Sequence, residues 1–278
     1  MKLITFRHNP DGAELVGALE DGGVAPLRAY PSMTALIRAG LPAALPDERI
    51  PLTDITPLAP IPRPEQDVIC LGMNFSDHTR EAARFHPTMV REDWAVYFSK
   101  RVNEAVPDGG FIDGHFDVTQ KLDYEAEVAF VLSKDAYRVR PEDARDYVFG
   151  YTLLNDVSAR EVQTRHKQFY LGKSFDGFTP IGPCIVTADE FTFPPRIRLR
   201  CYVNGELRQD GSTEQWIYGV ADVIADLSAA MTLRAGTIVS MGTPAGVGMG
   251  FDPPKFLRPG DVVRCEADGI GTLTNTVR

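Results

Sequence analysis

The chain has 278 residues, of which 44% are apolar and 24% are charged, ordinary proportions for a globular protein with a sizeable core. Its 29 basic and 38 acidic residues give a net charge of −9. Nucleic-acid grooves and membrane-binding surfaces need basic stripes, so this balance argues against both kinds of partner. An anionic substrate would need local positive charge from a metal or from a few Lys and Arg side chains.

The cysteines and the N-terminus point to an intracellular compartment. The four cysteines lie far apart and form no CxxC pair, which favours reduced thiols in a cytosolic protein; they are Cys70, Cys184, Cys201 and Cys265. The initial run MKLITFRHNP is too short for a signal peptide, and no stretch approaches 18 apolar residues. We therefore expect a soluble, cytoplasmic protein.

Residues 1–60 are predicted to form a small α+β domain. The strand-like runs KLITF, AELVGAL and GVAPL are followed by one helical stretch, SMTALIRAG, that ends at Gly40. The next segment, DITPLAPIPRPE at residues 54–65, contains four prolines. Because proline fixes φ and removes a donor, we expect an extended connector there, with residues 61–278 forming the catalytic body.

The body is predicted to be β-rich α+β. Short strand-like runs are punctuated by Gly and Pro: DVICLG, WAVYFSK, YEAEVAFVL, GPCIVT, RIRLRCYVNG and GTIVSMG. Helical patterns are fewer, with PEDARDYV and GVADVIADLSAAM, and NGEL predicts a hairpin turn. Strands do not alternate with helices as a doubly wound sheet requires. The glycines of GVGMG precede FDPPKFLRPGD, which cannot continue as a helix, so a nucleotide loop is not expected.

The first candidate site residues lie in KLDYEAEVAFVL, at 121–132. Side chains alternate along a strand, so Asp123, Glu125 and Glu127 share one face opposite an apolar face. A solvated strand face is the simpler interpretation of Glu-x-Glu alone. Burying two like charges costs several kcal/mol unless a cation compensates, so burial here would argue for a metal.

A third carboxylate follows the apolar run YTLL, which ends at Asn155 and Asp156. A strand end that delivers an Asp into a polar cluster is a frequent site geometry, and an Asp that caps the next helix is the alternative. Three carboxylates with carbonyl or water ligands suit Mg²⁺, Mn²⁺ or Ca²⁺. Zinc is disfavoured because the histidines show no HxH or HxxxH spacing.

A candidate general base lies in NFSDHTREAARF, which predicts a short helix that Pro87 prevents from continuing. His78 and Glu81 are three residues apart and face the same side of that helix. A carboxylate beside an imidazole fixes its tautomer and raises its basicity, which suits a base that activates water. A surface pair without a catalytic role is the alternative.

Two further segments could bind negative charge. LGKSFDGFTPIGP places Lys173 between glycines, where it could neutralise a substrate carboxylate or a developing enolate, with an exposed lysine as the alternative. VSMGTPAGVG runs into a Gly-rich turn at Thr243, which could present backbone N–H groups and a hydroxyl to an anion or could be a plain tight turn.

Taken together, the chain resembles the fumarylacetoacetate hydrolase family, in particular its smaller bacterial members and the acylpyruvases. The matching stretches occur in the family's order from about residue 66 to the end: LGMNFSDHTREAA, LDYEAEVAFVL, GYTLLNDVSAREVQ, GKSFDGFTPIGP, GTPAGVG and LRPGDVVRCEADGIGTLTNTV. The resemblance implies a mixed β-sandwich roll with a small N-terminal α+β domain, and usually a homodimer. The stretch HPTMVREDWAVYFSK departs from the family's pattern.

The resemblance also implies roles for individual residues. It implies a divalent metal held by Glu125, Glu127 and Asp156. It places a His–Glu dyad on a lid that orders over substrate and an active-site lysine among the catalytic positions, which are His78, Glu81 and Lys173. The positions matched to substrate contact or to support of the site are Arg160, Gln163 and Thr243.

The expected activity is metal-dependent cleavage of a C–C bond in small 2,4-dioxo acids of the acylpyruvate type, through a metal-stabilised enolate. Mg²⁺ is the expected metal, with Mn²⁺ or Ca²⁺ as alternatives. The same enolate would serve decarboxylation of oxaloacetate-type acids, or isomerisation and tautomerisation of hydroxymuconate-type diacids. A non-catalytic calcium- or 2-oxo-acid-binding protein is the alternative from another class, although the chain has no DxDxDG calcium loop.

Overall fold

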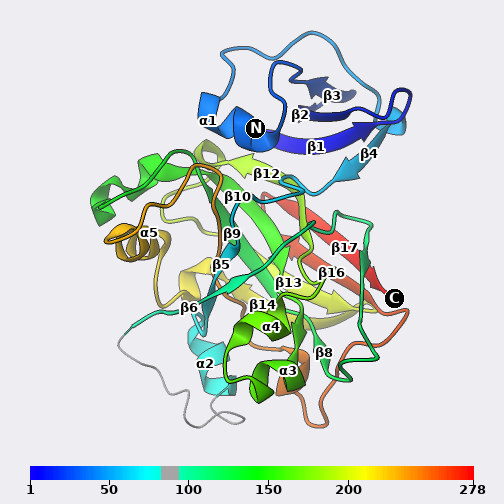
Figure 1. The fold of residues 1–278 in the computed structure, drawn as a ribbon, viewed down its shortest axis with the longest axis vertical. Helices are drawn as coiled ribbons and strands as arrows, with labels where there is room; N and C mark the ends of the chain where they lie inside the picture. The colour runs from blue at the N-terminus through cyan, green and yellow to red at the C-terminus, as the bar shows by residue number, and fades with distance from the viewer. Residues whose placement is uncertain (83–93) are drawn as a thin grey trace.

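The computed structural model describes residues 1–82 and 94–278 (Figure 1). A ten-stranded sheet has the order β3-β2-β1-β12-β10-β9-β15-β5-β6, with β4 paired to β1. Its strands are β1 (Lys2–His8), β2 (Glu14–Glu20), β3 (Gly23–Pro26), β4 (Ile55–Leu58), β5 (Val68–Gly72), β6 (Val96–Lys100), β9 (Ala126–Leu132), β10 (Val148–Asn155), β12 (Ile181–Thr187) and β15 (Ile238–Ser240).

The remaining strands form a five-stranded sheet and a short pair. The five-stranded sheet has the order β14-β13-β16-β17-β7, and β11 pairs with β8. These strands are β7 (Phe111–Ile112), β8 (Leu122–Asp123), β11 (Ser158–Ala159), β13 (Arg198–Val203), β14 (Glu206–Ser212), β16 (Val262–Ala267) and β17 (Gly271–Val277). The predicted β-rich α+β class is confirmed.

The helices are short and lie around the sheets. They are α1 (Met33–Ala39), α2 (Ser76–Ala82), α3 (Arg160–Arg165), α4 (Phe169–Lys173) and α5 (Val220–Ser228). Figure 1 shows α2, α3 and α4 gathered at the end of the body far from the N-terminal strands. No helix in the described ranges is long and apolar enough to cross a membrane. The predicted end of α2 before Pro87 lies outside the described residues.

The expected elements near the N-terminus are present. Ser32 caps α1 by accepting a hydrogen bond from the Ala35 amide, and Gly40 ends the helix with φ 84°. β1 pairs with β12 of the body, with Leu3 opposite Ile185, so the sheet runs without interruption from the N-terminal strands into the body. The division of the chain at about residue 60 stays a prediction.

Two predicted elements differ from the structure. PEDARDYV forms a 3₁₀ helix, Pro141–Tyr147, instead of an α-helix. The single strand predicted over 121–132 is split into β8 and β9, because the chain changes partners: Asp123 pairs with Ser158 on β11, whereas Ala126 pairs with Asn155 on β10. The break places Glu125 between two strands.

Strand β9 is buried on both faces. Val128, Phe130 and Leu132 belong to one hydrophobic cluster, and Ala129 and Val131 to a second cluster on the other side. The predicted alternation of side chains is therefore confirmed, with the second face covered instead of open to solvent. In the sheet, β9 lies between β10 and β15, so the ends of these three strands can place side chains close together.

Candidate active site

Three carboxylates converge where β9 begins and β10 ends. One oxygen from each of Glu125, Glu127 and Asp156 lies within 4.8 Å of the others, and all three side chains are buried. The register explains the convergence, because Leu154 lies opposite Glu127 on the paired strands and Asp156 follows two residues later. We call these three residues the carboxylate cluster.

Buried cations neutralise part of the cluster. The Lys173 ammonium lies 2.7 Å from Oε2 of Glu125 and 2.7 Å from Oδ2 of Asp156. Nη2 of Arg160 lies 2.7 Å from Oε1 of Glu125. Burial by itself would raise the pKa of Glu125, but the positive charges of Lys173 and Arg160 outweigh it and lower that pKa. Burial likewise opposes the charged form of Lys173, yet Asp156 and Glu125 hold the pKa of this lysine above its ordinary value.

Glu127 is held differently. Its Oε2 accepts hydrogen bonds from the Ser240 hydroxyl at 2.6 Å and from the Gly242 amide at 2.9 Å. Among the described residues, no cationic side chain forms an ion pair with it. Burial raises the pKa of Glu127 well above its ordinary value, and the negative charges of Asp156 and Glu125 raise it further. Of the three carboxylates in the cluster, Glu127 thus has the least positive charge next to it.

The charge balance and the donor atoms fit a divalent metal. Four buried carboxylates, those of the cluster and Asp123, face three buried cations, Lys100, Arg160 and Lys173. When Glu127 is ionised, one negative charge is in excess where bulk water cannot solvate it, and a bound cation would compensate that charge. The donors are carboxylate oxygens, which Mg²⁺, Mn²⁺ and Ca²⁺ prefer. The cluster could hold such an ion.

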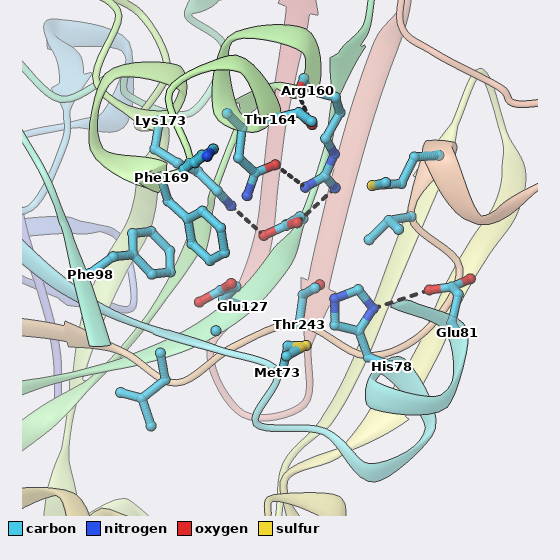
Figure 2. Close-up of a pocket in the computed structure, with 17 residues that line it drawn as sticks. Met73, His78, Glu81, Phe98, Glu127, Arg160, Thr164, Phe169, Lys173 and Thr243 are labelled. Atoms are coloured by element: carbon cyan, nitrogen blue, oxygen red, sulfur yellow. Dashed lines mark hydrogen bonds and ion pairs between the residues drawn. The ribbon is translucent and has the colours of Figure 1, made fainter. Parts of the chain in front are cut away.

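The predicted dyad lies across from the cluster. On α2, Nδ1 of His78 is 3.1 Å from Oε2 of Glu81, and the two side chains are only 12% and 14% exposed. Figure 2 shows the His78 imidazole on the cavity side of Glu81, and Thr243 lines the same cavity. With Nδ1 engaged by the carboxylate, Nε2 is the ring nitrogen left to act on a molecule in the cavity.

A cavity of about 390 Å³ separates the dyad from the cluster. Its polar lining consists of His78, Glu81, Glu125, Glu127, Arg160, Gln163, Thr164, Lys167, Lys173 and Thr243. Its apolar lining consists of Leu71, Gly72, Met73, Phe98, Phe169, Val247 and Met249. All the predicted site residues except Asp156 line this cavity. Asp156 is fully buried, and its Oδ2 contacts the Lys173 ammonium, which does line the cavity.

The three predicted substrate or support residues have clear local partners. Arg160 donates through Nε to Oδ2 of Asp123 at 2.9 Å and through Nη1 to Oε1 of Gln163 at 3.3 Å. The Thr243 hydroxyl donates to the Ala126 carbonyl at 2.8 Å, which attaches the turn after β15 to β9. These bonds fix the cavity wall on both sides of Glu125.

The amides of the Gly-rich turn bind the protein's own carboxylates. The Gly242 amide donates to Glu127, as described above, and the Gly246 amide donates to both oxygens of Glu81 at 3.1 and 3.2 Å. The amides of Gly248 and Met249 donate to Asp123 at 2.7 and 3.0 Å. The turn was predicted to present N–H groups to an anion. In the structure these amides bind carboxylate side chains of the protein itself.

Residues 67–278 match the family model described as "Fumarylacetoacetate (FAA) hydrolase C-terminal". The chain belongs to the fumarylacetoacetate hydrolase family. The roll-type fold predicted from the resemblance is confirmed by solved structures of this family. "Fumarylacetoacetate hydrolase (EaFAH)" from Exiguobacterium antarcticum is 39% identical, with a TM-score of 0.89 over 100% of this chain and 99% of its own.

Other relatives carry the names of a tautomerase and an isomerase. "Oxaloacetate tautomerase YisK" of Bacillus subtilis (strain 168) is 43% identical over 231 residues, which are 81% of this chain and 74% of that protein. The structure titled "5-carboxymethyl-2-hydroxymuconate delta-isomerase" from Mycobacterium smegmatis is 31% identical, with a TM-score of 0.80 over 100% of this chain and 99% of its own. The chain is thus an enzyme of this family, and its relatives include proteins named as a tautomerase and as an isomerase.

The site contains two buried residues to which the sequence analysis assigned no role. Lys100, at the end of β6, donates to Oδ1 of Asp156 at 2.5 Å, and Asp123 accepts from Arg160 and from the turn amides. Lys100 ends the apolar run WAVYFSK, and a charged residue at the end of a strand is usually solvated, so its burial gave no local signal. Asp123 was assigned to the face of Glu125, but its partners are distant in sequence.

Proposed function

We propose that the protein interconverts the keto and enol forms of a small 2-oxo diacid of the oxaloacetate type, with Mg²⁺ as its metal. The observation that carries the proposal is the opposition of two groups across one cavity, the His78–Glu81 dyad on one wall and the carboxylate cluster with Lys173 on the other. Keto–enol exchange needs a base at the carbon and positive charge at the oxygen. This arrangement supplies both.

Each side chain has a task in this reaction. His78 accepts the proton from the carbon next to the keto group, and Glu81 holds the tautomer and stabilises the imidazolium that forms. The Lys173 ammonium lies where negative charge develops on the oxygen, and burial strengthens its effect. A divalent metal held by Glu125, Glu127 and Asp156 supplies, when bound, a Lewis acid for the keto oxygen. The imidazolium then returns its proton, through water, to the enolate oxygen. The enol is complete, His78 is neutral again, and the composition of the substrate is unchanged.

A diacid substrate is supported by the charge at the cavity. Lys167 lines the cavity, and none of the described residues forms an ion pair with it, in contrast to Arg160 and Lys173. In a protein with a net charge of −9, this cation can attract a second carboxylate. The name of the Bacillus subtilis relative is consistent with a four-carbon diacid.

Hydrolysis of acylpyruvates, the activity expected from the sequence, is the second candidate. The dyad favours it, because an imidazole oriented by a carboxylate can also activate water for attack on the C4 carbonyl. The C3–C4 bond would break, and water would supply the atoms that complete pyruvate and a carboxylic acid. The name of the Exiguobacterium antarcticum structure supports this candidate.

A substrate panel separates the candidates. Freshly dissolved oxaloacetate is followed by its enol absorbance with Mg²⁺ and then with excess chelator, while pyruvate release is measured from oxaloacetate and from acylpyruvates. We expect metal-dependent acceleration of enol loss without pyruvate release. Pyruvate from acylpyruvates would favour the hydrolase, and pyruvate from oxaloacetate would favour a decarboxylase. No effect on any 2-oxo acid, with or without metal, would favour a non-catalytic binding protein.

A further inference from the structure

The carboxylate of the dyad rests against a glycine-rich segment, residues 246–250. Both oxygens of Glu81 accept from the Gly246 amide, at 3.1 and 3.2 Å. A Cβ built on Gly250 would lie 2.1 Å from Oε1 and 2.5 Å from Cδ of Glu81. Glu81 therefore occupies the space that any side chain at position 250 would need.

The two glycines are required for different reasons. Gly246 has φ 102°, and a Cβ there would lie 1.9 Å from the Arg208 carbonyl oxygen, so its own backbone demands glycine. Gly250 does not have a left-handed φ, and the three nearest atoms to its Cβ position all belong to Glu81. Alanine at 250 is thus compatible with the local backbone and conflicts with the Glu81 side chain.

The segment is anchored independently of Glu81. The buried Asp123 accepts from the Gly248 and Met249 amides, and the Gly250 amide donates to the Val247 carbonyl at 2.9 Å. The same Asp123 pairs with Arg160, which in turn contacts Glu125. The surface that meets Glu81 is therefore fixed relative to the carboxylate cluster.

We propose that segment 246–250 is the positioning element of the dyad: it orients Glu81 through the Gly246 amide and the open side of Gly250, and through Glu81 it orients His78. The inference rests on the proposed function, in which the dyad transfers the proton. A carboxylate without this support could rotate away from Nδ1, and the imidazole would lose its fixed direction toward the cavity.

The test is Gly250→Ala combined with Glu81→Ala in a double-mutant cycle. We expect Gly250→Ala alone to lower kcat by about 10- to 100-fold with little change in KM or in Mg²⁺ affinity. In the Glu81→Ala background the same change should cost nothing further, because the conflicting side chain is gone. Gly219→Ala is the matched control, because the nearest atom to its Cβ position lies 3.5 Å away and its φ is −78°.

Unchanged kcat in Gly250→Ala, or an equal loss in both backgrounds, would overturn the inference. A crystal structure of Gly250→Ala gives a second readout, with Glu81 expected to leave the Gly246 amide while Glu125, Glu127 and Asp156 stay in place. If the wild-type protein turns over no 2-oxo acid, the proposed function fails. The inference is then tested by the crystal structure of Gly250→Ala alone: Glu81 displaced from the Gly246 amide supports it, and Glu81 in its wild-type position overturns it.

Discussion

The ammonium group of Lys100 lies 2.5 Å from Oδ1 of Asp156, and neither side chain is exposed to solvent. Lys100 also donates to the carbonyls of Val157 and Phe178, at 3.2 and 3.0 Å. Asp156 therefore has one oxygen held by a lysine outside the cavity and the other held by Lys173, which lines it. The ion pair with Lys100 therefore holds the Asp156 carboxylate independently of its contact with Lys173.

Lys100→Met should destabilise the protein by about 3–5 kcal/mol, because it leaves a buried carboxylate with one partner fewer. Urea unfolding of the metal-free protein measures the change. Lys2→Met, at an exposed lysine of β1, is the control and should stay within about 0.5 kcal/mol of wild type. Equal stability of Lys100→Met and wild type would contradict the prediction.

Glu127→Gln should stabilise the metal-free protein at neutral and higher pH. The pKa of Glu127 is raised in the folded state, so folding favours the protonated form. Its contribution to stability is complete below the ordinary glutamate pKa and is lost as pH rises through the raised value. The neutral amide avoids that loss, and we expect a gain of about 1–3 kcal/mol at pH 8 and none at pH 4. Thermal unfolding in chelator at both pH values measures it.

When Mg²⁺ is bound, the wild-type protein should be more stable than Glu127→Gln, the reverse of the order expected without metal. Mg²⁺ should raise the Tm of wild type and should leave Glu127→Gln unchanged, because the amide removes a charged ligand. Thermal unfolding across a Mg²⁺ titration provides the comparison. A variant that Mg²⁺ stabilises as much as wild type would place the ion elsewhere.

His78→Asn should lower kcat by about 10²- to 10⁴-fold while Mg²⁺ affinity stays unchanged. The imidazole lies across the cavity from the carboxylate cluster, so its loss removes the base without removing a metal ligand. Calorimetric titration with Mg²⁺ and the enol assay provide the two readouts. Loss of metal binding together with activity would mean that His78 supports the cluster.

Lys167→Met should weaken binding of a diacid relative to a monoacid. An exposed ion pair contributes about 0.2–1 kcal/mol, so KM for oxaloacetate should rise by roughly 1.5- to 5-fold. Inhibition by pyruvate, which lacks the second carboxylate, should not change. Arg165→Met, at an exposed arginine of α3 that does not line the cavity, is the control. An equal effect on both ligands would assign Lys167 another role.

Local sequence pattern predicted much of the fold and the close pairs within single segments. Alternation over residues 121–132 put Glu125 and Glu127 on one face, the end of the run YTLL marked Asp156, and helical spacing paired His78 with Glu81. Local pattern was sufficient here because each of these inferences depends on residues a few positions apart. The family resemblance supplied what spacing could not, namely that these separate pieces form one site.

The sequence could not predict the contacts that join distant strands. Lys100 and Asp156 are 56 residues apart, and Asp123 meets Gly248 across 125 residues. Such pairs depend on strand order and register, which no local pattern specifies. The split of the strand at Tyr124 has the same origin, because β8 and β9 take different partners. The homodimer, the cytoplasmic location and the roles of the site residues stay predictions.

The position of β9 at the centre of the large sheet, with both faces covered, has a practical consequence for enzyme engineering. Substitutions in or beside β9 would disturb two hydrophobic clusters at once, so libraries that randomise residues around Glu127 should yield mostly unfolded variants. Gln163, Thr164 and Lys167 lie on or just after the short helix α3 and can vary without altering the sheet. New substrate preferences should therefore be selectable from mutagenesis of these three positions alone.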